Sequence, residues 1–172
     1  MSTLRRGTRL AAGGLALLAA VSAAEAAGRR FAVVVPTTAT AFYEAVGEGC
    51  RTRAATLADT TCRVLGPGGE ETRGQAEILR DLVAEKVDGI AVSALRPEDL
   101  TPALTAAAAA GIPVVAFDAD LPAGLRRAWV GTNARDFGRS LGASLDRWRP
   151  AGGRYAVITG DASVTALSDR VA

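Results

Sequence analysis

Residues 111–120 read Gly-Ile-Pro-Val-Val-Ala-Phe-Asp-Ala-Asp. The apolar run at residues 112–117 is short, unbroken and rich in β-branched side chains. These features are typical of a strand that is buried on both faces of a sheet. Asp118 and Asp120 follow directly at the carboxyl end of this strand.

The residues before this strand complete a strand-helix-strand unit. Residues 102–110 are good helix formers, and Gly111 and Pro113 end that helix. An earlier apolar run, residues 89–92, ends in Ser93. In open parallel sheets, ligands bind outside the carboxyl ends of the strands. The two polar strand ends are therefore where we expect a binding site.

The same alternation of strands and helices extends along most of the chain. It predicts an α/β fold whose sheet is mostly parallel. We expect strands at residues 31–35, 62–65, 87–92, 112–117, 129–131 and 155–159, and helices at 42–58, 70–85, 102–110 and 133–148, with another helix beginning in 166–172.

Composition narrows the class of protein. The chain has 172 residues, 49% of them hydrophobic, which is enough for one domain with a substantial core. Three of the 20 basic residues and one of the 18 acidic residues lie in the first 26 positions, so the rest of the chain is electrically balanced. Nothing in this balance indicates binding to nucleic acid or to an anionic membrane surface.

Residues 1–26 have the order of a secretory signal peptide. Arg5, Arg6 and Arg9 form a basic start, residues 10–21 form an apolar stretch too short to span a bilayer, and residues 24–26 read Ala-Glu-Ala. We expect this segment to be removed on export. The mature protein is expected in the periplasm, without stable membrane insertion.

Export permits disulfides, and the chain has two cysteines, Cys50 and Cys62. Cys50 falls on the first expected helix and Cys62 begins the second strand, so their Cα atoms should lie within about 7 Å of each other. A disulfide and a pair of buried thiols both remain open. Two cysteines without any histidine make a poor metal site, and we expect no metal.

The sequence contains few of the motifs that enzymes use for catalysis or for cofactor binding. Gly66-Pro67-Gly68-Gly69 lies between a strand and a helix, but a dinucleotide loop would need glycine at position 71, which is Glu71. Glu70 and Glu71 would also repel a pyrophosphate, so a structural turn is favoured and no cofactor is expected. Histidine, the commonest general base, is absent, which leaves Asp118 and Asp120 as the only acid–base pair to consider.

A binding role uses the polar strand ends better. Phe42 and Tyr43 follow the first strand, where aromatic rings could stack on the apolar face of a sugar. The carboxylate of Asp118, at the same edge of the sheet, could accept hydrogen bonds from two vicinal hydroxyls. The competing interpretations are a core position for Phe42 and a solvated turn for Asp118. Asp120 is expected to be more exposed and less important.

From residue 30 to the end, the chain resembles the type I periplasmic solute-binding proteins of sugar ABC transporters, the ribose-binding-protein-like group. The order and spacing of several short stretches carry the resemblance: 31–35, 40–43, 87–93, 111–120, 130–133 with Gly138, and Asp169-Arg170. It implies two α/β lobes that close on a sugar or similar polyol. Residues 27–131 would form the N-terminal lobe and residues 132–172 the beginning of a truncated C-terminal lobe.

The resemblance also implies roles for particular residues. Asp118 would bind ligand hydroxyls, Phe42 and Tyr43 would stack on the sugar, and Arg170 would reach the ligand from the second lobe. The remaining polar candidates are Asn133 at the crossover, Ser93, and Thr40, where the family often has asparagine. The protein would deliver its solute to an ABC permease; a module feeding a sensor kinase or chemoreceptor is the alternative. The identity of the sugar stays open.

Overall fold

Five short strands form one sheet, and every pairing in it is parallel. The structure is a computed structural model that describes residues 28–68, 74–94, 96–160 and 164–172. The strand order is β2-β1-β3-β4-β5. The bounds are β1 Arg29–Val34, β2 Thr60–Leu65, β3 Gly89–Val92, β4 Val114–Phe117 and β5 Ala128–Val130. The parallel α/β fold predicted from the sequence is confirmed.

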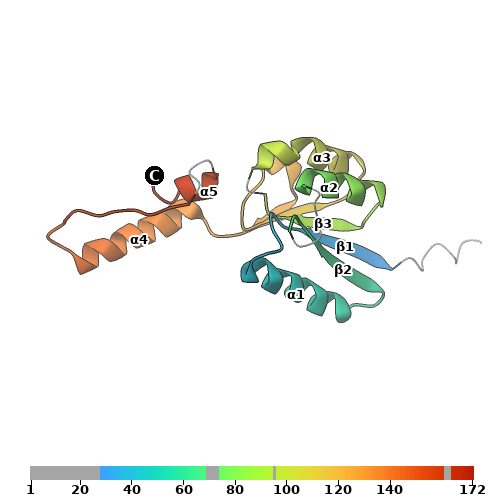
Figure 1. Ribbon diagram of the computed structural model, residues 1–172, viewed down its shortest axis with the longest axis horizontal. Helices are drawn as coiled ribbons and strands as arrows, with labels where there is room; N and C mark the ends of the chain where they lie inside the picture. The colour runs from blue at the N-terminus through green and yellow to red at the C-terminus, as the bar shows by residue number, and fades with distance from the viewer. Residues whose placement is uncertain (1–27, 69–73, 95, 161–163) are drawn as a thin grey trace, which may run out of the picture.

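Helices cover both faces of this sheet (Figure 1). Helix α1 lies on one face, and α2 and α3 lie side by side on the other. The helices are α1 Ala41–Ala55, α2 Gln75–Ala84, α3 Pro97–Ala109, α4 Ala134–Trp148 and α5 Thr165–Ser168, with a 3₁₀ turn η1 at Ala123–Leu125. A sheet covered in this way needs apolar residues on both faces, which explains the unbroken apolar runs of its central strands.

The larger core lies under α2 and α3. Val34, Val92 and Ala116 of the three central strands are fully buried there. Leu79 of α2 and Leu104 of α3 pack against them and are also fully buried. A smaller cluster, built on Val33, Val35 and Tyr43, fills the space between the sheet and α1.

The order in which strands are added to the sheet reverses at β1. From β1 it goes first to β2 on one side and then returns to β3 on the other. Such a switch point opens a crevice at the carboxyl ends of the strands, where ligands bind in folds of this kind. The residues that follow β1, β3 and β4 meet at that edge.

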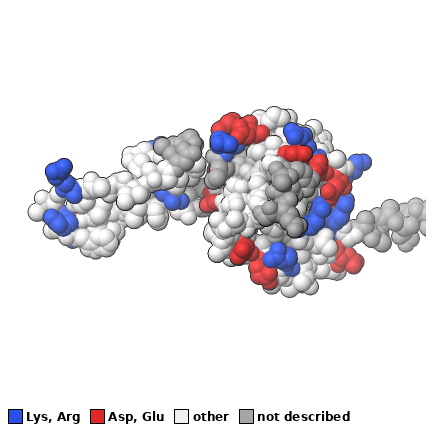
Figure 2. Space-filling view, in the orientation of Figure 1, with Lys and Arg blue, Asp and Glu red and all other residues white. Residues whose placement is uncertain are grey.

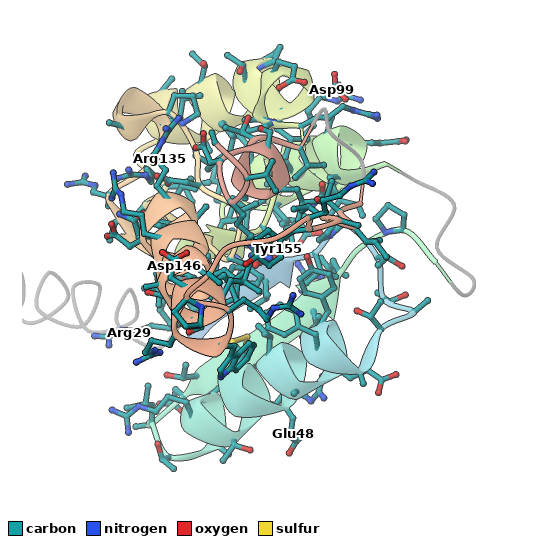
Figure 3. All side chains as sticks on the ribbon, turned by 90° about the vertical axis from the view of Figure 1, so that its left-hand side faces the viewer. Arg29, Glu48, Asp99, Arg135, Asp146 and Tyr155 are labelled. Carbon is teal, nitrogen blue, oxygen red and sulfur yellow. A yellow bond between two sulfur atoms is a disulfide. The ribbon has the colours of Figure 1, made fainter. Side chains whose placement is uncertain are left out.

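Helix α1 is tied to the neighbouring strand by the predicted cysteine pair. Cys50 and Cys62 form a disulfide with a Cα–Cα distance of 6.0 Å. The sulfur–sulfur bond is visible between α1 and the sheet in Figure 3. The expected proximity is confirmed, and of the two open alternatives the bridged one holds.

Several predicted element boundaries were wrong. The helix expected at 102–110 begins at Pro97, because proline is well suited to the first helical position and Glu98 and Asp99 favour the positive end of the helix dipole. The helix expected at 70–85 begins at Gln75, after Gly74 in an extended conformation. Residues 70–73 lie outside the described residues, as does the proposed signal peptide.

The strand expected at 155–159 is absent. Its residues have no regular secondary structure and are exposed, Ile158 being 96% exposed. A strand needs a neighbour to complete its hydrogen bonds, and no strand of the described residues lies beside this segment.

Helices α4 and α5 lie to one side of the body formed by the sheet and α1–α3 (Figure 1). Residues 131–133 connect β5 to α4. None of the residues of α4 is buried. Among the described helices, none is both long and apolar enough to cross a bilayer.

Candidate functional site

Three side chains from distant parts of the sequence meet at the carboxyl edge of the sheet. The hydroxyl of Tyr43 donates to Oδ2 of Asp118 at 3.1 Å. The hydroxyl of Ser93 lies 3.3 Å from the same oxygen and 3.3 Å from the hydroxyl of Tyr43. Each residue follows a different strand, β1, β3 or β4, so the parallel sheet itself brings them together.

Tyr43 is held by the small core beneath α1. It lies in the first turn of that helix and is only 8% exposed. Its ring makes edge contacts with Phe42 and Phe117, at centroid distances of 5.0 and 6.4 Å. The ring is therefore fixed within the fold, and its hydroxyl is the part that reaches the rim.

Burial raises the pKa of Tyr43 above its ordinary value. The nearby charge of Asp118 and the hydrogen bond to that carboxylate raise it further, while the hydrogen bond with Ser93 acts in the opposite direction. The phenol is therefore protonated at neutral pH and available as a donor.

Ser93 is fully buried at the end of β3. Its carbonyl accepts a hydrogen bond of 2.8 Å from Nε2 of Gln75 in the first turn of α2. Nothing in the sequence marked Gln75, because a single glutamine at a helix start is common on any surface. Its contact nevertheless joins α2 to the site.

Asp118 has an unusual backbone. Its φ is +59°, in the left-handed region that aspartate visits more readily than most residues. Its N–H donates to the carbonyl of Val130 at 2.9 Å, and its carbonyl accepts from Nε1 of Trp129 at 3.2 Å. These two bonds to β5 hold a side chain that is itself exposed. Within the described chain, Oδ1 of Asp118 has no hydrogen-bond partner.

Asp118 opens onto a cavity of about 690 Å³. That volume is in the range of cavities that hold small ligands. Its walls come from the start of α3, the loop after β4, the end of β5 and the starts of α4 and α5, and they include Glu98, Trp129, Asn133 and Asp169. Trp129 was placed in a strand by the sequence but was not recognised as part of a site.

Phe42 and Thr40 lie away from this cavity. Phe42 is 56% exposed, so it does not occupy the core position considered as an alternative. Thr40 is exposed just before α1, and its carbonyl accepts from the N–H of Glu44 at 3.1 Å. Neither residue lines the cavity that contains Asp118.

The two candidates beyond residue 131 behave differently from each other. Asn133 lines the cavity, and its Oδ1 accepts from the N–H of Asp136 at 3.1 Å, which caps α4. Arg170 lies over the ring of Phe137, 5.2 Å from its centroid, beside a separate depression. The structure thus brings Asn133 to the cavity of Asp118 but does not bring Arg170 there.

Asp120 corrects one expectation from the sequence. It was expected to be more exposed than Asp118, yet it is half-buried while Asp118 is exposed. Its Oδ2 accepts from a terminal nitrogen of Arg126 at 2.9 Å, and its Oδ1 accepts from the N–H of Leu121 at 2.7 Å. The ion pair with Arg126, six residues away, holds Asp120 within the loop after β4. Strand periodicity could not predict this pairing.

Basic and acidic side chains are interspersed on the visible face of the sheet-containing body (Figure 2). Among the described residues, no group of three or more histidine, cysteine, aspartate or glutamate side chains could hold a metal ion.

A parallel α/β lobe with hydroxyl and carboxylate groups gathered at its switch point defines a ligand-binding lobe. Residues 31–172 match the family model described as a periplasmic binding protein domain, and the chain belongs to that family. The resemblance seen in the sequence is confirmed. The family is one of binding proteins rather than a class of enzymes, and it is periplasmic.

Solved structures of sugar-binding proteins share this fold. One is the solute-binding protein of an ABC transporter from Burkholderia graminis in complex with D-arabinose, with 28% identity and a TM-score of 0.74 over 84% of this chain and 50% of that one. A glucose-galactose binding protein from Geobacillus stearothermophilus has 27% identity and a TM-score of 0.71 over 84% of this chain and 51% of its own.

A third is an ABC transporter solute-binding protein from Agrobacterium vitis with bound D-fucose, with 26% identity and a TM-score of 0.73 over 83% of this chain and 50% of that one. The chain therefore spans about half the length of the solved proteins that it matches.

Proposed function

We propose that this chain is the N-terminal portion of an exported solute-binding protein that captures a sugar or similar polyol and delivers it to an ABC permease. The observation that carries the proposal is the carboxylate of Asp118. It is anchored through one oxygen, has no hydrogen-bond partner among the described residues at the other, and lines a cavity of about 690 Å³. The similar proteins with bound D-arabinose and D-fucose support a sugar as the solute and transport as the role.

The proposal includes the division of the chain. Residues 1–26 serve as a signal peptide, residues 27–131 form the first lobe, and residues 132–172 begin the second. The position of α4 and α5 beside the sheet-containing body supports this boundary (Figure 1). Cavity walls on both sides of residue 131 support a ligand that lies between the lobes.

The chemistry of capture follows from the charge on Asp118. An ionised carboxylate oxygen accepts two hydrogen bonds, which suits a pair of neighbouring sugar hydroxyls. Charge-assisted bonds of this kind contribute roughly 1.5–3 kcal/mol each. Trp129, which lines the same cavity, is a further candidate for an apolar contact with the ligand. Phe42 and Arg170 are proposed to join the site when the lobes close.

Isothermal titration calorimetry of the full-length mature protein tests the proposal. The panel consists of D-arabinose, D-fucose, D-glucose, D-galactose and a linear polyol. We expect at least one to bind, and Asp118→Ala to weaken that binding about a hundredfold, since two lost bonds amount to about 3 kcal/mol. Asp146→Ala, which removes an exposed carboxylate of α4, is the control and should change nothing. Failure of the whole panel to bind would overturn the solute class.

A further inference from the structure

Both hydroxyls at the site contact the same oxygen of Asp118. Tyr43 and Ser93 each carry one hydroxyl proton, and both protons can be donated to Oδ2, at 3.1 and 3.3 Å. The χ2 torsion of an aspartate is broad, so an exposed carboxylate normally rotates and exchanges its two oxygens. Two donors from separate strand ends oppose that rotation here.

We propose that Tyr43 and Ser93 are positioning residues that hold Oδ2 of Asp118 against the protein, so that Oδ1 alone is presented to the ligand. The inference rests on the proposed sugar-binding function and specifies its geometry. A ligand bound by Asp118 must direct its hydroxyl protons to a single oxygen. Neighbouring hydroxyls that converge on one point fit this requirement, and hydroxyls arranged to span both oxygens do not.

The fold keeps both donors in place. The ring of Tyr43 is packed among Val33, Val35 and Phe117, so its hydroxyl has little freedom to leave the rim. Ser93 is fully buried at the end of β3, with its carbonyl bound by Gln75. The donors are therefore more rigid than the carboxylate that they hold. Groups that position a binding residue must themselves be held more rigidly than that residue.

Removing one donor should weaken ligand binding without emptying the site. Tyr43→Phe keeps the buried ring and removes only the hydroxyl, and Ser93→Ala removes the other donor with little change in volume. We expect each variant to bind its best sugar about fivefold to tenfold more weakly, the effect of one hydrogen bond. Tyr155→Phe, at an exposed tyrosine in the segment after α4 (Figure 3), is the matched control and should bind as wild type does.

A double-mutant cycle separates positioning from direct contact. If Tyr43 acts through Asp118, then Tyr43→Phe should have no further effect on sugar affinity in the Asp118→Ala background. An undiminished effect in that background would mean that the hydroxyl of Tyr43 contacts the ligand itself, and it would overturn the proposal. Wild-type affinity in both single variants, measured by calorimetry on the same sugar panel, would overturn it as well.

A measurement without ligand distinguishes failure of this inference from failure of the proposed function. The two bonds to Oδ2 tether the end of the side chain, so they should restrict its χ1 torsion as well as χ2. Three-bond NMR couplings between Hα and the β-protons of Asp118, which report χ1, should therefore show a single rotamer in the wild type and averaged rotamers in the Tyr43→Phe, Ser93→Ala double variant. If no sugar binds but the couplings change in this way, the sugar function is wrong and the positioning role stands. Couplings that are the same in both proteins would overturn the positioning role.

Discussion

At the scale of single residues, the site depends on a backbone that the fold holds in a costly conformation. Asp118 has its φ at +59°, and a non-glycine residue in a sparsely populated region costs on the order of 1–3 kcal/mol. Its bonds to the carbonyl of Val130 and the indole of Trp129 oppose relaxation of that conformation. The result is a backbone held in place at the point where Asp118 lines the cavity.

The phenol of Tyr43 makes one part of the stability dependent on pH. Burial and Asp118 raise its pKa above the ordinary 10.0, so the folded state keeps the phenol proton more strongly than the unfolded state. This stabilising contribution is complete below pH 10 and is lost as the pH rises through the raised pKa. We therefore expect the free energy of unfolding to fall above pH 10 by more in the wild type than in Tyr43→Phe.

Urea unfolding at a series of pH values on both sides of 10.0 measures this difference. All other side chains are the same in the two proteins, so their contributions cancel in the comparison. Parallel pH curves for the two proteins would contradict the prediction.

The sequence could identify Asp118 and Ser93 as candidates because each directly follows an apolar strand, and Tyr43 because it comes just after the loop that leaves the first strand. It could not show that the three touch, since their contact depends on the order β1-β3-β4 within the sheet. Nor could it show that the ring of Tyr43 is buried while that of Phe42 is exposed. Adjacent helical residues point in different directions, and only packing against the sheet decides which one faces the core.

At the scale of elements, α1 approaches β2 closely enough to require a glycine. A Cβ added at Gly47 would lie 2.7 Å from Cγ2 of Val64, whereas one added at Gly49 would have no atom within 4 Å. Alanine in an exposed helix position is favoured over glycine by up to about 1 kcal/mol. We expect Gly49→Ala to stabilise the protein and Gly47→Ala to destabilise it by about 1–3 kcal/mol through overpacking.

Denaturant unfolding of the two variants checks this prediction, because each serves as the control for the other on one helix. Stabilisation by both substitutions would show that Val64 moves aside at little cost.

The disulfide is the second tie between the same two elements. Cys50 and Cys62 are separated by 12 positions, and a covalent loop of that size stabilises a fold by about 3 kcal/mol. We expect reduction to lower the free energy of unfolding by that amount. The Cys50→Ser, Cys62→Ser double variant should behave as the reduced wild type does. Equal stability of oxidised and reduced protein in urea would contradict this.

Element boundaries show where sequence patterns mislead. Pro97 and Pro102 both suit the start of a helix, and the acidic first turn together with the burial of Leu100 favours the earlier one. The apolar pattern of residues 155–159 is that of a strand, but a strand also needs neighbours. Pattern alone therefore predicted the five paired strands and failed at the one segment that has none.

At the scale of the whole molecule, the body and the α4–α5 segment differ in how much they bury. The apolar side chains Phe137, Leu141 and Trp148 of α4 are 42, 51 and 75% exposed. Helix α3, of similar length, buries Leu100 and Leu104 almost completely. Elements with few buried contacts open at low free energy.

Hydrogen exchange of the 172-residue chain, followed by mass spectrometry, should therefore show α4 exchanging much faster than α3. Helix α3 is the internal control, because it has comparable length and the same solvent conditions. Equal protection of the two helices would contradict the prediction, because it would mean that contacts other than side-chain burial protect the amides of α4.

The Cys50–Cys62 disulfide also determines when the lobe reaches its full stability against unfolding. A protein made in a reducing cytoplasm and exported to an oxidising compartment gains such a bond only after it has crossed the membrane. Before that, the lobe would be weaker by the amount predicted for the reduced protein, and so easier to unfold for passage. If the proposed export holds, the reduced precursor is easier to unfold and so suited to translocation. The oxidised mature lobe is more stable and so suited to ligand capture.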